Sequence, residues 1–169
     1  LWIVGMDYEA GHRVVFGRDD APTVALSDAV MASCAIPGWF EPVTIEGRTY
    51  IDGGAWSATS ADVLAAQGLD EVIVVAPMVS FENDEPDSLL SRLERRWRGS
   101  VTRRCLAEVD ELEAAGVQVT VLGPGREDLE AMGGNIMDGR RRLQVLETSL
   151  RTSRSALEQG GSGRLADTG

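Results

Sequence analysis

The sequence predicts an α/β protein in which helices alternate with parallel strands. From Asp52 onward, segments of helical and strand character follow one another as helix, strand, helix, strand and helix. That order is typical of parallel strands joined by helices. The segment 71–76 contains a continuous apolar run rich in β-branched residues, as expected for a buried strand. We therefore expect a layered α/β domain.

Composition excludes several classes of function. The chain has 169 residues, of which 43% are hydrophobic and 25% charged, which is ordinary for one globular domain. The net charge is −11, so we expect no nucleic-acid partner, because phosphate binding depends on basic residues. No run approaches the roughly 18 apolar residues of a transmembrane helix, and no signal peptide is recognisable.

The two cysteines indicate the cellular compartment of the protein. Cys34 and Cys105 lie far apart in sequence and in apolar surroundings. We expect them to be buried free thiols of a cytoplasmic protein rather than a disulfide. The chain has no cluster of cysteine and histidine, so no zinc site is expected.

The first elements are two strands. Residues 1–7 and 13–16 have strand character, and Tyr8 to Gly11 is expected to link them as a hairpin. The first strand is apolar throughout, and such a strand expects neighbours on both sides. Because only later residues are available to supply them, we expect that an upstream part of the domain is missing.

A short helix and a hairpin come next. Ser27 is expected to cap an alanine-rich helix over 28–34, which Pro37-Gly38 stops. Residues 43–45 and 49–51 are expected to pair as strands around the turn Glu46-Gly47-Arg48.

The remainder supplies the alternating helices and strands. The long helix carries an apolar stripe at helical spacing, and the last eleven positions form a Gly/Ser-rich tail. We expect residues 1–158 to be domain and 159–169 to be flexible tail. The expected elements are a helix over 60–67 begun by Ser60, a strand over 71–76, a loop over 80–87, a helix over 87–115 with Leu89, Leu93, Trp97, Val101, Cys105, Val109 and Leu112 in its stripe, a strand over 117–122, a glycine-rich stretch over 123–139 and a final helix with Leu143, Leu146, Leu150 and Leu157 on one side.

The sequence Asp52-Gly53-Gly54 is the strongest candidate for chemistry. The aspartate follows a strand directly, and functional residues of α/β sheets lie at the carboxyl ends of strands. The two glycines lack Cβ, so backbone can approach a ligand or partner closely. Asp7, at the end of the first strand, could lie at the same sheet edge, although a turn carboxylate is the simpler interpretation.

Two pieces of sequence carry a family resemblance: residues 32–43, which read ASCAIPGWFEPV, and residues 50–54, which read YIDGG. Their order and separation resemble the patatin-like phospholipase family, in which a helix ending in an S-x-A-x-P-G-type loop precedes a hairpin and D-G-G. The resemblance covers about residues 1–75. It implies a three-layer α/β/α hydrolase, here incomplete on its N-terminal side, which cleaves lipid esters with a Ser-Asp dyad. Asp52 would then be the general base, with Gly53 and Gly54 as supporting motif.

The histidine content is consistent with a dyad. An α/β-hydrolase triad places its histidine after the aspartate, and no histidine follows Asp52. His12 is expected to be a surface residue of the first hairpin. If hydrolysis occurs here, a carboxylate must accept the serine proton.

Two elements of the family pattern are absent from this chain. No serine lies in G-x-S-x-G, so the chain contains no nucleophile. No glycine-rich oxyanion loop precedes Asp52, and Gly123-Pro124-Gly125-Arg126 is better interpreted as a strand-to-helix turn. After D-G-G, residues 55–62 also depart from the family's usual asparagine and proline, which leaves open how the Asp52 loop is braced.

Several residues have two interpretations. Pro37, Gly38, Trp39 and Phe40 either line an acyl-chain pocket or, for the aromatic pair, belong to the core beneath a loop. The cluster of arginines on the long helix either contacts anionic lipid or, as we favour, is a solvated face balanced by glutamates. Its members are Arg92, Arg95, Arg96, Arg98, Arg103 and Arg104.

The resemblance implies a lipid acyl hydrolase that needs neither metal nor diffusible cofactor. Its expected partner is a lipid or acyl-ester substrate, with peripheral contact to a membrane. The 169 residues alone are expected to be inactive, because they carry only the aspartate of the dyad. The alternative is a catalytically inactive patatin-like module that binds lipid or a protein partner.

Overall fold

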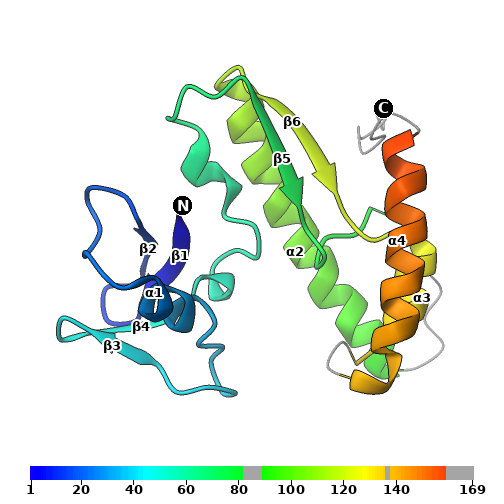
Figure 1. The fold of residues 1–169 in the computed structure, drawn as a ribbon, viewed down its shortest axis with the longest axis horizontal. Coiled ribbons are helices and arrows are strands. Elements are labelled where there is room, and N and C mark those ends of the chain that lie inside the picture. The colour runs from blue at the N-terminus through cyan, green and yellow to red at the C-terminus, as the bar shows by residue number, and fades with distance from the viewer. Residues whose placement is uncertain (82–88, 136–137, 159–169) are drawn as a thin grey trace. The chain divides into compact units, whose positions relative to one another are not determined.

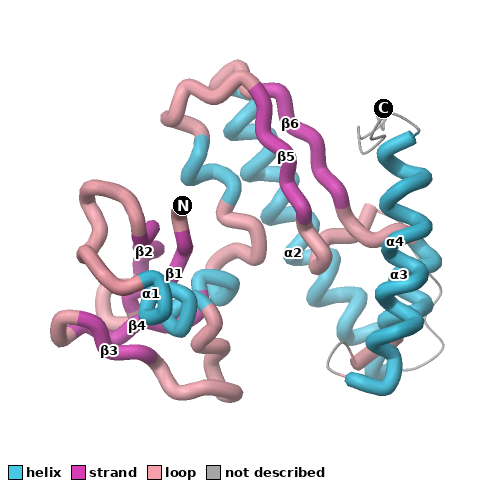
Figure 2. Tube along the Cα trace, in the orientation of Figure 1, coloured by secondary structure: helices cyan, strands magenta, loops and turns pink. Residues whose placement is uncertain are grey.

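The structure is a computed structural model that describes residues 1–81, 89–135 and 138–158. The chain forms two compact units, Leu1–Val63 and Leu64–Gly169, which are described separately. Both units contain strands and helices, so the protein is of the mixed α/β kind (Figures 1 and 2). The expected tail, 159–169, and most of the expected loop over 80–87 lie outside the described residues.

The first unit is built on a four-stranded antiparallel sheet. Its spatial order is β2 (His12–Phe16), β1 (Ile3–Asp7), β4 (Arg48–Asp52) and β3 (Val43–Ile45). The first hairpin forms as expected. The apolar β1 has a neighbour on each side, because β4 pairs with it antiparallel. The expectation that later residues leave this strand without a second neighbour is therefore wrong.

Helix α1 (Leu26–Ser33) packs against one face of this sheet. Ala29 and Ala32 of the helix are buried with Phe16, Ile45 and Tyr50 of the strands. Phe16 and Tyr50 meet edge to face, with ring centroids 5.2 Å apart. The helix begins two residues earlier than expected, and its N-cap is Ala25 without a side-chain hydrogen bond, so the expected capping role of Ser27 is wrong.

The turn between β3 and β4 explains how tightly that hairpin closes. Glu46 and Gly47 both adopt positive φ, of 50° and 77°. Two successive positive φ values define the type I′ turn, whose twist matches that of paired strands. Arg48 belongs to β4 rather than to the turn. This hairpin fixes the register of the strand that ends at Asp52.

The second unit contains a parallel strand pair. Its strands are β5 (Glu71–Val75) and β6 (Gln118–Leu122), which pair in parallel. In this register Glu71 is opposite Gln118 and Val75 is opposite Leu122. The chain between the two strands contains α2 (Leu89–Ala114), which packs against β6. The predicted strand-helix-strand order with parallel strands is confirmed. β6 leads into α3 (Arg126–Met132), so Gly123 to Arg126 is indeed a strand-to-helix turn. The remaining elements are η3 (Gly139–Arg141) and α4 (Arg142–Glu158), and α3 packs against α4.

Three further expectations differ from the structure. The expected helix over 60–67 is a short 3-10 helix, η2 (Ala61–Leu64), and Ser60 lies before it with a non-helical φ of 48°. The glycine-rich stretch contains a helix, α3, that the sequence did not predict. Within the α2 stripe, Cys105, Val109 and Leu112 are buried, whereas Trp97 is 51% exposed and is not a core residue. The side chains of Leu89 and Leu93 lie outside the described residues.

Candidate functional site

Asp52 is the last residue of β4 and is held there by backbone contacts on two sides. It pairs with Gly5 of β1 in the antiparallel ladder. Its backbone N–H also donates to the carbonyl oxygen of Ala35, just after α1, at 3.0 Å. Directly paired residues of an antiparallel sheet project to the same face. Asp52 therefore shares a sheet face with Val14, which pairs with Gly5 and packs against the core beneath α1.

The carboxylate of Asp52 caps the short helix that follows it. Oδ1 accepts a hydrogen bond from the backbone N–H of Gly54 at 2.6 Å, at the start of the 3-10 helix η1 (Gly53–Ala55). Among the described residues, no donor reaches Oδ2, and no serine hydroxyl is hydrogen-bonded to this carboxylate. The side chain is partly exposed. One oxygen is thus fixed while the other remains accessible to a proton donor.

Gly53 and Gly54 are required for different reasons. A Cβ on Gly53 would lie 2.6 Å from the carbonyl oxygen of Val4, so β1 could not approach so closely. A Cβ on Gly54 would lie 2.9 Å from Oδ1 of Asp52 and would force the carboxylate to move. The first glycine permits packing against the sheet, and the second permits the observed position of the aspartate.

The loop after η1 is braced by hydroxyls and by an ion pair. The hydroxyl of Ser57 accepts from the backbone N–H groups of Thr59 at 3.3 Å and Ser60 at 3.1 Å. Arg13 of β2 binds Asp62 with both terminal nitrogens, one of them at 2.7 Å from Oδ1. These contacts brace the loop that follows Asp52.

Arg13 also lies 5.9 Å from the ring centroid of Trp56, a cation–π distance. The sequence alone does not reveal this cluster, because Arg13 and Asp62 are 49 residues apart. The one local signal was a charged side chain within an otherwise apolar strand. Arg13 therefore ties β2 to the loop that follows Asp52.

The Pro37–Phe40 segment forms an exposed turn. The backbone N–H groups of Trp39 and Phe40 both donate to the carbonyl oxygen of Ile36, and Gly38 has φ of 82°. Trp39 is 66% exposed and Phe40 is 58% exposed. The interpretation of these aromatics as core residues is therefore wrong. Their expected contact with an acyl chain stays a prediction.

A comparison with protein-family models identifies this region. Residues 3–65 match the family model of the patatin-like phospholipases. The family resemblance seen in the sequence is confirmed over this span, which contains the four-stranded sheet, α1 and Asp52-Gly53-Gly54. The match indicates a hydrolase that acts on lipid esters.

Asp7 does not share a sheet edge with Asp52. Asp7 pairs with Tyr50 whereas Asp52 pairs with Gly5, so the two aspartates stand at opposite ends of the β1–β4 ladder. The Asp7 side chain is buried and accepts from the backbone N–H of Ala10 at 2.8 Å and from Arg48 at 2.9 Å. The Ala10 hydrogen bond, followed by the Arg48 contact, holds the pKa of Asp7 below its ordinary value despite burial. Asp7 is a turn carboxylate of the first unit.

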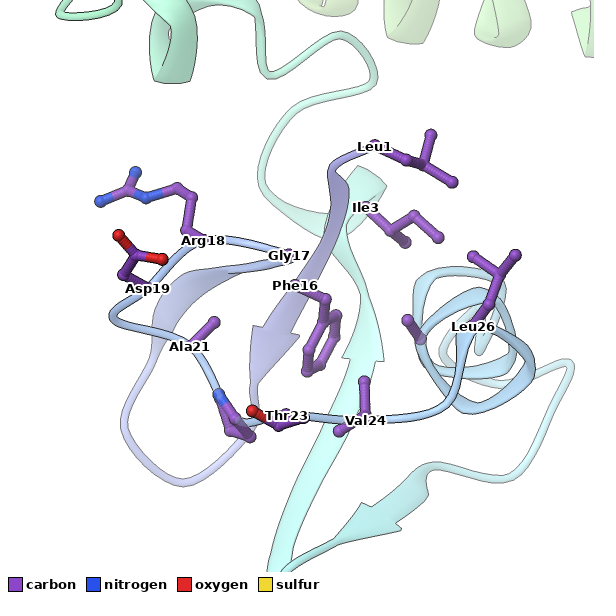
Figure 3. A pocket seen from close by; sticks show the side chains of 12 residues that line it. Leu1, Ile3, Phe16, Gly17, Arg18, Asp19, Ala21, Thr23, Val24 and Leu26 are labelled. Atoms are coloured by element: carbon purple, nitrogen blue, oxygen red, sulfur yellow. The ribbon is translucent and has the colours of Figure 1, made fainter.

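An open depression of about 610 Å³ lies beside α1 in the same unit. Figure 3 shows Phe16 between the first strands and the loop that carries Thr23 and Val24, with Leu26 on the helix opposite. Arg18 and Asp19 also line this depression. Neither Asp52 nor residues 37–40 line it, so the structure does not join this depression to the candidate site.

The arginines of α2 do not form one solvated face. Arg98 is buried, and its Nη1 donates to the carbonyl oxygen of Pro77 at 3.0 Å. Arg104 pairs with the buried Glu108 at 3.3 Å. Arg96 and Arg103 are exposed, while the side chains of Arg92 and Arg95 lie outside the described residues. Arg98 therefore stabilises the unit rather than contributing to a surface.

The described part of the chain contains no group of His, Cys, Asp and Glu side chains that could hold a metal ion. His12 is exposed at the start of β2, as expected for a residue at the hairpin. Neither Cys34 nor Cys105 forms a disulfide, but Cys34 is exposed, so its expected burial is wrong. None of the helices in the described ranges is long and apolar enough to span a membrane.

Proposed function

We propose that this chain is part of a lipid acyl hydrolase of the patatin-like kind, in which Asp52 acts as the general base of a Ser-Asp dyad. The observation that supports the proposal is the state of the Asp52 carboxylate. One oxygen is fixed by Gly54, and the other is free of donors among the described residues. A base needs both properties, because the proton acceptor must be positioned and must also be accessible.

The proposed reaction follows the ordinary course of acyl transfer. The serine hydroxyl gives its proton to the free oxygen of Asp52 as the serine oxygen attacks the ester carbonyl carbon. The tetrahedral intermediate expels the alcohol, which takes the proton from Asp52, and an acyl-enzyme remains. Asp52 then accepts a proton from water as the water oxygen attacks the acyl carbon, and the serine oxygen leaves with that proton, which releases the fatty acid and regenerates the serine and the Asp52 carboxylate. No step requires a metal ion or a diffusible cofactor.

The nucleophile has to come from residues other than these. The sequence contains no G-x-S-x-G, and no glycine-rich loop precedes Asp52. We place both in another segment of the full-length protein, which would complete a three-layer α/β/α domain around the sheet of the first unit. On this proposal the 169 residues alone do not hydrolyse esters.

The test is Asp52→Asn in the full-length protein, assayed on a p-nitrophenyl ester. Asparagine can still accept the hydrogen bond from Gly54, so the loop should be kept while the base is lost. We expect kcat to fall by roughly a hundredfold or more. Asp70→Asn, which removes an exposed carboxylate from the second unit, is the matched control and should retain activity. Full activity of the Asp52→Asn protein would contradict the proposal.

The alternative, an inactive module that binds lipid or protein, is motivated by the missing nucleophile. The two proposals predict different results for the full-length protein treated with a fluorophosphonate ester, which labels activated serines. Labelling that depends on Asp52 supports the hydrolase. A full-length protein that is not labelled, yet still binds lipid vesicles, supports the inactive module.

A further inference from the structure

The hydrogen bond that fixes the Asp52 carboxylate depends on a very short helix. Oδ1 of Asp52 accepts from the backbone N–H of Gly54, which lies within η1. The bond that closes this turn runs from the backbone N–H of Trp56 to the carbonyl oxygen of Gly53 at 3.0 Å. A single 3-10 turn has poor hydrogen-bond geometry and little cooperative stability of its own. The direction of the Gly54 N–H, and with it the position of Oδ1, therefore depends on what holds the turn from outside.

Arg13 holds the end of this turn to the sheet. Its guanidinium lies 5.9 Å from the ring centroid of Trp56, which is the C-cap of η1. Arg13 is opposite Met6 in the ladder, and Met6 is opposite Ile51, so these side chains share a sheet face. Because Ile51 precedes Asp52, and neighbours along a strand project to opposite faces, Arg13 stands on the face opposite that of Asp52. Arg13 thus contacts the turn after Asp52 from the other side of the sheet.

Asp62 fixes the guanidinium of Arg13 in that position. Both terminal nitrogens of Arg13 bind the carboxylate of Asp62, and the two side chains are only 17% and 12% exposed. Such a two-point pair restricts the orientation of the arginine. Asp62 belongs to η2, so one arginine contacts both ends of the segment between Trp56 and Asp62.

The segment between η1 and η2 also has internal support. The Ser57 hydroxyl accepts from the backbone N–H groups of Thr59 and Ser60. These bonds lie within the segment and do not tie it to the sheet. Loss of the Arg13 contacts should therefore loosen the segment from the sheet without unfolding it.

We infer that Arg13 is a positioning residue for Asp52, acting through Trp56 and Asp62 on the turn that orients the carboxylate. The inference rests on the proposed function, because it concerns proton transfer to Asp52. That transfer requires the serine hydroxyl and the carboxylate oxygen to lie within hydrogen-bond distance. A displacement of about 1 Å can cost much of the rate without changing how substrate binds. Arg13 therefore affects kcat rather than KM.

The test is Arg13→Gln in the full-length protein, assayed on a p-nitrophenyl ester. The measured kcat is expressed per serine that a fluorophosphonate titrates to completion. We expect this kcat to fall roughly tenfold while KM stays within about twofold of the wild-type value. A purely structural role of Arg13 would lower the titratable fraction and leave kcat per titrated serine unchanged, and that result would overturn the inference.

Trp56→Leu is a second variant that leaves the Arg13–Asp62 pair in place. It removes the aromatic ring by which Arg13 reaches η1. If Arg13→Gln does not yield folded protein, Trp56→Leu decides the question. A lowered kcat per titrated serine supports the inference, and an unchanged kcat overturns it.

Arg18→Gln is the matched control. Arg18 likewise pairs with an aspartate, Asp20, and lies 5.8 Å from the ring centroid of a tryptophan, Trp2. None of these three residues belongs to the segment after Asp52. Arg18→Gln should keep the kcat and KM of the wild type. An equal loss of kcat in Arg18→Gln would show a general effect of removing a positive charge and would overturn the inference.

Combining Arg13→Gln with Asp52→Asn tests the route of the effect. If Arg13 acts through Asp52, it should change the residual kcat of the Asp52→Asn protein by less than about twofold. The same tenfold loss in both backgrounds would overturn the inference. If Asp52→Asn loses activity while Arg13→Gln does not, the dyad stands and the inference is wrong. If Asp52→Asn keeps full activity, the dyad is wrong and the inference is overturned with it.

Discussion

The backbone N–H of Gly54 lies 2.6 Å from Oδ1 of Asp52, so the aspartate is fixed by the glycine two residues after it. A methyl group at Gly54 would come within 2.9 Å of the same oxygen. We expect Gly54→Ala to displace the carboxylate without unfolding the unit, because position 54 is exposed and its φ is not positive. In the full-length protein, kcat should fall roughly tenfold or more while the thermal midpoint stays near that of the wild type. A lowered thermal midpoint with unchanged kcat would contradict this prediction.

Gly53→Ala should have the opposite effect. Here the added methyl group would lie 2.6 Å from the backbone oxygen of Val4, and backbone cannot rotate away as a side chain can. Overpacking of this kind typically costs about 1–3 kcal/mol. The free energy of unfolding, measured in urea, should fall by that amount in the isolated chain.

Gly99→Ala provides the control for Gly53→Ala. Gly99 lies within α2, and its added methyl group would meet only the Arg103 guanidinium at 3.8 Å. Alanine is favoured over glycine inside a helix, so this substitution should stabilise by about 0.5–1 kcal/mol. If Gly53→Ala and Gly99→Ala change the free energy of unfolding equally, the close approach of Gly53 to β1 does not restrict the side chain at position 53.

The elements that the sequence predicted are those governed by short-range chemistry. The turn between β3 and β4 follows from Gly47, which adopts positive φ without steric cost. β5 and β6 follow from their β-branched runs, and Asp52 was identified from its local motif. The family match over residues 3–65 is consistent with that local signal.

The features that the sequence did not predict depend on distant contacts. The pairing of Gly5 with Asp52 crosses most of the first unit, so no local pattern could reveal that β4 would be the second neighbour of β1. Helix α3 was hidden by its flanking glycines, although Asp128 accepts from the backbone N–H of Gly125 at 3.0 Å as an N-terminal cap. The exposure of Trp97 shows that a periodic stripe predicts a helix face but not what covers it.

Arg13 and Asp62 should be energetically coupled. Their side chains are only 17% and 12% exposed, and they meet with two hydrogen bonds. A double-mutant cycle of Arg13→Gln and Asp62→Asn should give a coupling free energy of about 1 kcal/mol or more. The same cycle on the exposed pair Arg18 and Asp20 should give no measurable coupling. If the two double-mutant cycles give the same coupling free energy, Arg13 does not brace the loop after Asp52.

Asp7 should make the stability of the first unit depend on pH. Its pKa is lowered from 3.8, chiefly by the Ala10 hydrogen bond and also by Arg48. A carboxyl group with a lowered native pKa stabilises fully above its unfolded pKa, and this stabilisation is lost as the pH falls through the native pKa. Asp7→Asn should therefore lower the free energy of unfolding at pH 7 by about 1–2 kcal/mol. The difference from the wild type should shrink as the pH falls below 3.8, and a difference independent of pH would contradict the role of the charge.

The two thiols should report on the two units separately. Cys34 is exposed in the first unit and Cys105 is buried in the second. In the native chain, a chromogenic disulfide reagent should react quickly with one thiol, and the second should react only on addition of urea. Cys34→Ala should abolish the fast reaction and leave the slow one. Because the buried Cys105 reacts only when α2 separates from the strands, the dependence of its reaction rate on urea concentration measures the stability of the second unit. Two fast thiols in the native chain would show that α2 does not protect Cys105.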